Sequence, residues 1–147
     1  MKFTAKWFDE LSSGEVYEIL RVRSQIFIVE MAMHCLDADG VDYAARHFFL
    51  EEEGRIVAYL RAFYADEQRR EVRIGRVLSV THGIGLGADV MRRALADIRA
   101  TMPCERLWLD SQTYASGFYE KLGFRTVSDE FIEAGVPHVQ MEWEDLR

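Results

Sequence analysis

Cysteine and proline are scarce in this chain, and each occurs only twice in 147 residues. Cys35 and Cys104 lie far apart and fit no metal-binding spacing, which excludes a zinc motif of closely spaced cysteines. Two isolated cysteines also provide no disulfide framework, so we expect free thiols in a reducing cytoplasm. The sequence therefore predicts a cytoplasmic protein and no metal site.

Long apolar runs and an excess of basic residues are also missing. No segment reaches the roughly 18 apolar residues that a membrane span requires, and residues 1–9 lack the apolar core of a signal peptide. The formal net charge of −7 argues against a nucleic-acid partner, because phosphate contacts dominate such binding. No repeat or linker interrupts the sequence, so we predict one domain over residues 1–147, with neither a membrane nor a nucleic acid as partner.

Glycine, in contrast, is concentrated in one short stretch. Gly83, Gly85 and Gly87 alternate after a β-prone run and directly before a helical pattern that ends near Met102. Glycines let the backbone approach a ligand closely, and a helix start adds unpaired N–H groups and partial positive charge. Phosphate groups commonly bind to this geometry. The stretch suits a tightly packed helix start equally well, and alone it does not separate the two interpretations.

Two common phosphate-binding motifs do not fit this stretch. In G-x-G-x-x-G the third glycine would come one residue later, and the P-loop requires a Lys-Ser or Lys-Thr pair that the chain lacks. The spacing resembles instead the acetyl-CoA loop of the GNAT N-acetyltransferase superfamily, Gln/Arg-x-x-Gly-x-Gly/Ala. His82, Gly85 and Gly87 occupy those positions, with His82 in place of the usual Gln or Arg.

Hydrophobic periodicity predicts a mixed order of elements, β-α-β-β-β-α-β-α-β-β. The predicted strands cover residues 2–8, 46–53, 55–64, 71–80, 106–111, 124–127 and 138–143. Helices are predicted over residues 13–31, where the pattern allows a break, from the glycine stretch to Met102, and over 116–122. The fourth and fifth strands should be parallel neighbours joined by a right-handed crossover. The predicted fold class is α/β (α+β), with a mixed, mostly antiparallel sheet flanked by helices.

A second motif strengthens the resemblance to the GNAT superfamily. Residues 112–124 read Gln-x-x-Ala-x-x-Phe-Tyr-x-x-x-Gly-Phe, which resembles the family signature Asn-x-x-Ala-x-x-Leu/Phe-Tyr-x-x-x-Gly-Phe with Gln112 for Asn. Within the superfamily the chain is similar to the small ElaA-type acyltransferases. The matching segments are residues 8–11, 23–30, 37–42, 46–47, 74–77 and 135–138.

The resemblance implies the GNAT fold with strands four and five splayed apart, and acetyl-CoA as the acyl-donor cosubstrate. It implies cofactor-binding roles for Leu78, Ser79, Val80, His82, Gly83, Gly85, Leu86, Gly87, Ala88, Gln112 and Tyr119. A main-chain amide of strand four, at Val80 or Leu78, would stabilise the oxyanion. Only Thr81 and His82 separate the strand from Gly83, a shorter connection than the family usually has.

The same resemblance implies catalytic roles that the residue types can support. Tyr119 would be the general acid, because a phenol of pKa about 10 keeps its proton at pH 7 and can pass it to a thiolate of pKa about 8.5. Tyr119 as a packing aromatic is the alternative. A lysine-like amine is neutral only about once in 2,500 molecules at pH 7, so a base is needed. Glu30 and His138 are predicted for this role, with Asp110 and His47 as further candidates.

Acceptor-binding roles are predicted for Arg23, Phe27, Glu30 and Asp110. Arg23 and Arg76 could hold a carboxylate of the acceptor or form internal salt bridges. An edge position facing solvent, or a pair with Arg76, is the alternative for Asp110. The acidic residues Asp37, Asp39 and Asp42 lack the twelve-residue spacing of a calcium loop, so we expect them to cap turns or to face a cationic acceptor.

The resulting functional hypothesis is an enzyme that transfers an acetyl group from acetyl-CoA to a primary amine by direct attack in a ternary complex. The acceptor would be a small-molecule amine or a peptide amine, and a homodimer is expected by analogy with the family alone. Two alternatives share the fold: a non-catalytic acyl-CoA-binding sensor or interaction protein, and an enzyme resembling acyl-homoserine lactone synthases.

Overall fold

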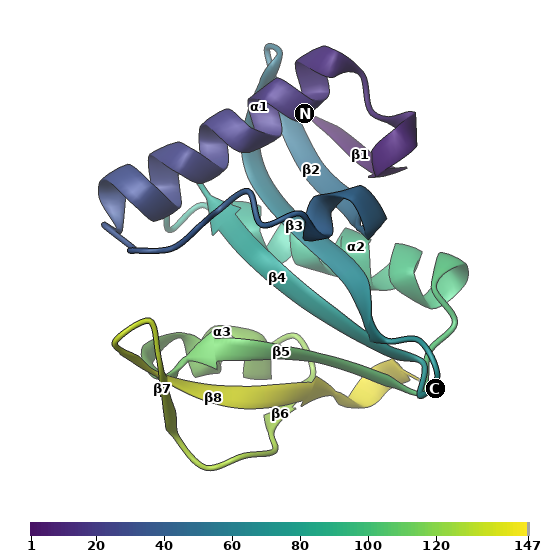
Figure 1. The fold of residues 1–147 in the computed structure, drawn as a ribbon, viewed down its shortest axis with the longest axis vertical. Helices are drawn as coiled ribbons and strands as arrows, with labels where there is room; N and C mark the ends of the chain where they lie inside the picture. Colours follow the sequence, from purple (N-terminus) through teal and green to yellow (C-terminus); the bar gives the residue numbers. More distant parts are fainter. Residues whose placement is uncertain (147) are drawn as a thin grey trace.

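Residues 1–146 are described by a computed structural model whose centre is an eight-stranded sheet (Figure 1). The strands follow the order β1-β2-β3-β4-β5-β8-β6, and β7 pairs with β8. Their bounds are β1 Lys2–Trp7, β2 Arg46–Glu52, β3 Arg55–Asp66, β4 Glu71–Ser79, β5 Arg106–Gln112, β6 Phe124–Thr126, β7 Phe131–Glu133 and β8 Val136–Trp143. Only the β4–β5 pair is parallel among the pairings of these strands, which confirms the predicted mixed, mostly antiparallel sheet.

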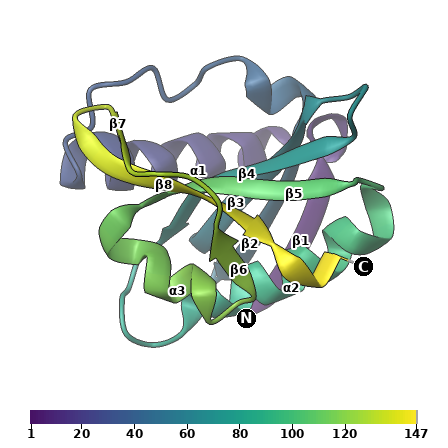
Figure 2. The same ribbon diagram turned by 90° about the horizontal axis from the view of Figure 1, so that it is seen from below.

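Two long helices cover opposite faces of the sheet (Figures 1 and 2). Helix α1 (Ser13–Arg23) continues as the π-helical segment η2 (Ser24–Glu30), and α2 (Leu86–Thr101) lies on the other face. The third helix, α3 (Ser116–Glu120), is short. Single 3₁₀ turns complete the chain: η1 Phe8–Glu10, η3 Val41–Ala44, η4 Thr113–Ala115 and η5 Glu144–Leu146.

Strand β2 shows why both faces need a helix. Phe48 and Leu50 are fully buried in the apolar cluster on the α2 side, whereas Phe49 is fully buried among residues of α1 and η2. Successive side chains of a strand point to opposite faces, so a continuous apolar run requires cover on both. One face of α2 is apolar, and its five residues (Val90, Met91, Ala94, Leu95 and Ile98) are all buried.

The parallel strands β4 and β5 stay together only at one end. They pair over Glu71–Arg73 and Arg106–Trp108. Beyond these positions β4 continues along β3 and β5 continues along β8, so the two strands diverge, as Figure 1 shows. The predicted splay is therefore confirmed.

Strand β4 also contains a β-bulge. Arg61 of β3 lies opposite Gly75, and Tyr59 lies opposite Leu78. Two steps along β3 thus face three steps along β4, which places one extra residue in β4. Within this bulge Arg76 has φ 55°, a left-handed conformation that only a few per cent of non-glycine residues adopt.

Two turns show how local sequence determines local structure. Ser12 accepts a hydrogen bond from the amide of Glu15, whose side chain bonds back to the amide of Ser12, as a capping box requires. Glu53 and Gly54 both have positive φ, which fits a two-residue hairpin turn of type I′.

The helix predicted over residues 13–31, with a possible break, extends to Glu30 and changes to π-helical geometry at Ser24. Two predictions need correction. Strand β7 was not predicted, because three residues are too few for a periodic signal. Strand β8 begins at Val136, two residues earlier than predicted.

No helix within residues 1–146 is both long enough and apolar enough to cross a membrane.

Candidate active site

The glycine turn connects the free end of β4 to α2. Gly83 and Gly85 have φ near +80°, and Gly85 is the N-cap of the sixteen-residue helix. Because helix starts leave amides unpaired, the first amides of α2, at Leu86, Gly87 and Ala88, are available to an anion. A Cβ placed on Gly83 or Gly85 would meet nothing within 4 Å, so the turn faces open space.

Gly87 has a different role from the two preceding glycines. A Cβ at this position would lie 3.4 Å from Cζ of Phe118, so the glycine allows α3 to pack closely against the start of α2. Phe118 and Tyr119 belong to the second sequence motif. The two motifs, separated by about 30 positions in the sequence, therefore meet at the free end of β4.

The main chain of Ser79 faces away from β3, toward the side where β5 diverges. The amide of Val80 donates to the carbonyl of Val57 at 2.9 Å, so that pair is hydrogen-bonded. Pairs alternate in an antiparallel ladder, which makes Leu78 opposite Tyr59 a hydrogen-bonded pair and Ser79 opposite Ala58 a non-hydrogen-bonded one. The predicted oxyanion donors Val80 and Leu78 are thus directed to β3, and Ser79 is the residue whose N–H is free on the β5 side.

Tyr119 lies in α3 and is partly buried against the main core. Its ring meets Phe118 edge-on at a centroid distance of 5.0 Å and Phe124 at 5.9 Å. Burial raises the pKa of the Tyr119 phenol, because the phenolate is poorly solvated there. The phenol therefore stays protonated throughout the physiological pH range, and its ring serves the packing role as well.

Asp110 lies on β5, on the sheet face opposite α2. The core side chains Leu107 and Leu109 point to the α2 face, so the alternate residues Trp108 and Asp110 point to the other. Asp110 Oδ2 accepts from Nη2 of Arg73 at 3.1 Å, while Oδ1 is buried with no partner among residues 1–146. Burial raises the pKa of Asp110, although the nearby Arg73 charge opposes the shift. The predicted alternative pairing with Arg76 is wrong.

His138 approaches the same sheet face from β8. Its register partner is Gln112, and Asp110 pairs with Gln140, so His138 and Asp110 are diagonal neighbours. The Nδ1–H of His138 donates to the carbonyl of Val136 at 2.7 Å, since a carbonyl can only accept. Nε2 is then the unprotonated nitrogen of the neutral ring, 4.0 Å from a carboxylate oxygen of Glu133. Whenever the ring is neutral, this hydrogen bond fixes the tautomer in which Nε2 can accept a proton.

Glu30, the other base predicted, stands at the end of η2 and is exposed. Its carboxylate accepts a hydrogen bond from Gln25 at 3.1 Å. No contact in the described part of the chain connects it with Asp110, His138 or Tyr119, so its catalytic and acceptor-binding roles stay predictions. His82 is also exposed, in the turn itself.

His47, a further candidate base, lies in the interior of the protein. Its side chain is buried, with Nδ1 2.7 Å from the Tyr59 hydroxyl and Nε2 3.0 Å from the carbonyl of Asp42. Burial lowers the pKa of His47 and keeps the ring neutral. With both ring nitrogens engaged, His47 has no position left from which to take a proton from an acceptor.

Arg23 and Phe27 are enclosed as well, which corrects their predicted contact with the acceptor. The Arg23 side chain has 0% exposure and bonds to Asp37 at 3.0 Å and to Asp42 at 2.6 Å. Phe27 packs in the apolar cluster between α1 and the sheet. The predicted alternative for Arg23, an internal salt bridge, is confirmed.

This salt bridge belongs to a larger network between the loop before η3 and the sheet. Arg61 bonds to Asp39 at 2.7 Å and to Asp42 at 2.9 Å, and Arg76 bonds to Asp37 at 3.0 Å. Asp39 also accepts from the amide of Val41, as a turn-capping residue does. The acidic loop is thus neutralised by arginines of this chain.

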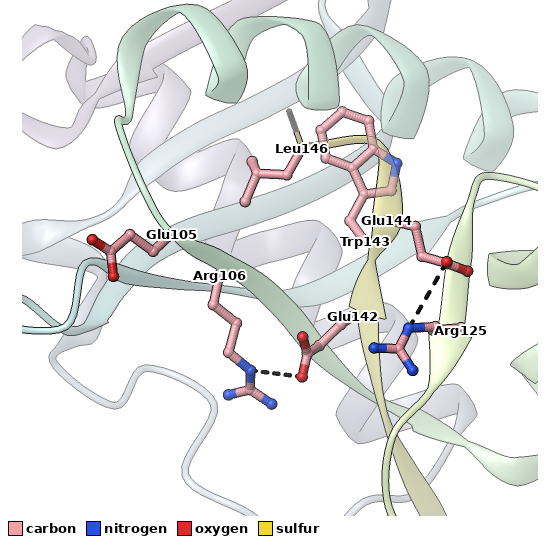
Figure 3. A pocket seen from close by; sticks show the side chains of 7 residues that line it. All are labelled: Glu105, Arg106, Arg125, Glu142, Trp143, Glu144 and Leu146. Atoms are coloured by element: carbon pink, nitrogen blue, oxygen red, sulfur yellow. Dashed lines mark hydrogen bonds and ion pairs between the residues drawn. The ribbon is translucent and has the colours of Figure 1, made fainter.

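Two cavities lie elsewhere on the molecule. Figure 3 shows one of about 280 Å³, whose walls come from the start of β5, from β6 and from the end of β8, with Glu142 paired to Arg106 and Glu144 to Arg125. The other, of about 350 Å³, lies between α1 and η3. The first is lined by none of the residues that the sequence predicted for the site, whereas the second is lined by His47, a candidate base, and by Asp42 of the acidic loop.

Diverging parallel strands, a glycine turn opening α2, and α3 packed against that turn are together the architecture of acyl-CoA N-acyltransferases. Comparison with known proteins agrees, because the "Acetyltransferase (GNAT) domain" family matches residues 20–145. The chain therefore belongs to the GNAT acetyltransferase family.

Individual relatives match almost the full length. A UPF0039 protein of Schizosaccharomyces pombe is 34% identical over 98% of this chain and 97% of its own. The crystal structure of Escherichia coli ElaA is similar with a TM-score of 0.91 at 29% identity, covering 97% of this chain and 99% of that one. An acyl-CoA N-acyltransferase from Pseudomonas aeruginosa has a TM-score of 0.88 at 30% identity, with the same coverage. The predicted ElaA-type resemblance is confirmed.

Proposed function

We propose that this protein transfers an acetyl group from acetyl-CoA to a primary amine, by direct attack of the amine within a ternary complex. One observation supports this most strongly. The anion-accepting glycine turn, the outward main chain of Ser79 and the phenol-bearing helix α3 are brought together at the free end of β4.

The groups at this end of β4 fit the chemistry of an acyl-CoA. Its pyrophosphate suits the amides of Leu86, Gly87 and Ala88 at the helix start, where the helix dipole favours negative charge. Its amide-containing arm suits the main-chain N–H and C=O of Ser79, which can bond an extended partner as a neighbouring strand would. The thioester supplies an activated acyl group when bound.

The roles of this chain's residues follow from their positions. Ser79 N–H donates to the carbonyl oxygen as negative charge develops on it. Asp110, through its unpartnered Oδ1, accepts the proton that the amine loses, and its raised pKa makes it a stronger base than an exposed aspartate. His138 Nε2 is the second base on the same face.

Transfer then forms the N–C bond of the new amide and breaks the C–S bond of the thioester. Tyr119 donates from its hydroxyl to the departing sulfur. Because burial raises the pKa of this phenol, full loss of its proton is costly, and we assign the larger part of its effect to the hydrogen bond.

Thermal unfolding with acetyl-CoA, CoA and NAD in parallel tests the donor. A ligand present at 100 times its dissociation constant stabilises the fold by about 2.7 kcal/mol. Stabilisation by acetyl-CoA and CoA but not by NAD supports the proposal and justifies an acceptor screen with small amines and peptides. No shift with millimolar acetyl-CoA contradicts it.

The same binding and turnover experiments also test the two alternative functions. Binding of acetyl-CoA without turnover over a broad amine panel favours a sensor or interaction protein. A lactone product from acyl carrier protein and S-adenosylmethionine favours a synthase. The acceptor, the cytoplasmic location and a homodimer remain predictions.

A further inference from the structure

The bulge in β4 decides which main-chain groups face the diverging strand β5. If the register that pairs Gly75 with Arg61 continued along β4 without a bulge, Ser79 would lie opposite Val57 and would bond to β3, and the Val80 amide would face outward. The side chains confirm that the alternation switches: Ile74 lies on the α2 side, whereas Leu78, four residues later, lies on the α1 side. The outward direction of Ser79 therefore depends on the bulge.

Arg76 carries the strain of this bulge. A left-handed conformation is unfavourable for a non-glycine residue relative to ordinary backbone geometry. Such a residue keeps its conformation only where surrounding contacts hold it. The contacts of Arg76 are therefore the ones that maintain the register beyond it.

Those contacts come from the loop between η2 and η3. Nε of Arg76 donates to Asp37 Oδ1 at 3.0 Å, and Nη2 donates to the Asp37 carbonyl at 3.1 Å. A further bond from Nη2 to Asp39 is longer, at 3.3 Å. Asp37 is itself held in place by Arg23, which donates hydrogen bonds to both its Oδ2 and its carbonyl oxygen. One aspartate thus holds Arg76 through its side chain and its main chain.

We propose that Asp37 is a positioning residue that locks the β4 bulge through Arg76 and so presents the Ser79 amide toward β5. That this amide serves a thioester rests on the proposed function. The effect of Asp37 on the β4 bulge is a property of the folded protein, and it can be measured on the main-chain amides without any substrate.

Amide hydrogen exchange measures the lock directly. In the bulged strand the Val80 amide is bonded to β3 and protected, and the Ser79 amide is not. Asp37→Asn weakens the hold on Arg76, so we expect protection at Val80 to fall at least tenfold. Asp97→Asn is the matched control, because Asp97 forms a comparable ion pair with Arg46 at 2.6 Å that joins α2 to β2 and does not touch β4.

A second variant separates strain from general damage. Glycine adopts positive φ without penalty, so Arg76→Gly removes the reason for the lock. We expect the double variant with Asp37→Asn and Arg76→Gly to regain protection at Val80. Exchange at Val80 that is equal in Asp37→Asn and Asp97→Asn overturns the proposal, and so does a double variant that is no better protected than Asp37→Asn.

Kinetics provide the functional readout. An amide that acts mainly in the transition state affects kcat more than KM. We expect Asp37→Asn to lower kcat at least tenfold, with less than a threefold change in KM for the amine, while Asp97→Asn keeps both. Equal kcat values for the two variants contradict the link to catalysis. Failure of the wild-type protein to transfer acetyl groups would refute the proposed function instead, and the exchange comparison would still test the lock.

Discussion

Gly85 provides the sharpest test of the donor site, because the chain contains a matched glycine elsewhere. Gly85 has φ 82° and Gly54 has φ 78°, and a Cβ at either position meets nothing within 4 Å. Gly85 opens α2 beside the free end of β4, whereas Gly54 lies in the β2–β3 hairpin. Alanine at both positions therefore imposes similar backbone strain, and only one of them faces the proposed ligand.

The expected magnitudes follow from that geometry. Each alanine costs about 1–2 kcal/mol of stability through the left-handed conformation alone. For chains of about this length, 1 kcal/mol corresponds to roughly 2–4 °C in Tm. In Gly85→Ala the new methyl group also projects into the space that a pyrophosphate would occupy, so we expect at least tenfold weaker binding of acetyl-CoA.

Thermal unfolding with and without acetyl-CoA distinguishes the two effects. At 100 times the wild-type dissociation constant, the ligand contributes about 2.7 kcal/mol to the wild-type protein and to Gly54→Ala. A tenfold weaker variant retains only about 1.4 kcal/mol of that stabilisation. If Gly85→Ala keeps the full ligand-induced shift, or if Gly54→Ala loses it equally, the assignment of the turn as the donor site is wrong.

Three further predictions concern the acid, the buried arginine and pH. Tyr119→Phe should lower kcat about 100-fold, the low end of the general-acid range, and unchanged turnover at every pH would refute the role. Arg23→Met should cost about 3–5 kcal/mol in urea unfolding, because Asp37 and Asp42 lose a buried partner. Hydrogen bonding from Arg61 holds the pKa of Asp39 well below its ordinary 3.8. This stabilisation is complete above about pH 5 and is lost as the pH falls through 4 and below, so Asp39→Asn should flatten the acid limb of the stability curve.

The parts of the fold with repeated patterns were predictable from the sequence. The apolar residues on one face of α2 recur every three or four positions, and Gly54 supplies the positive φ that a two-residue hairpin turn requires. The cofactor turn was predictable because three glycines before a helix constrain the backbone directly. These features depend on neighbours in the chain, so sequence spacing describes them well.

Features that depend on distant residues were not predictable in the same way. Arg76 was expected to pair internally or to meet the acceptor, but its positive φ has no local signal, and its side chain bonds to Asp37, which lies 39 residues away. The choice of Ser79 over Val80 as the outward amide follows from that one extra residue in β4. The pairing of Asp110 with Arg73 likewise depends on where two non-adjacent strands meet, which no local pattern records.

The short pairing between β4 and β5 has a mechanical consequence. Within the described chain it is the only strand pairing between residues 1–79 and residues 106–146, although both segments share the apolar core beneath α2. The sheet therefore consists of two antiparallel halves whose strands pair with each other only at one end. In the proposed complex the acetyl-CoA would lie between the diverging ends and bond to β4. The bound donor would then also hold the two halves of the sheet at a fixed angle.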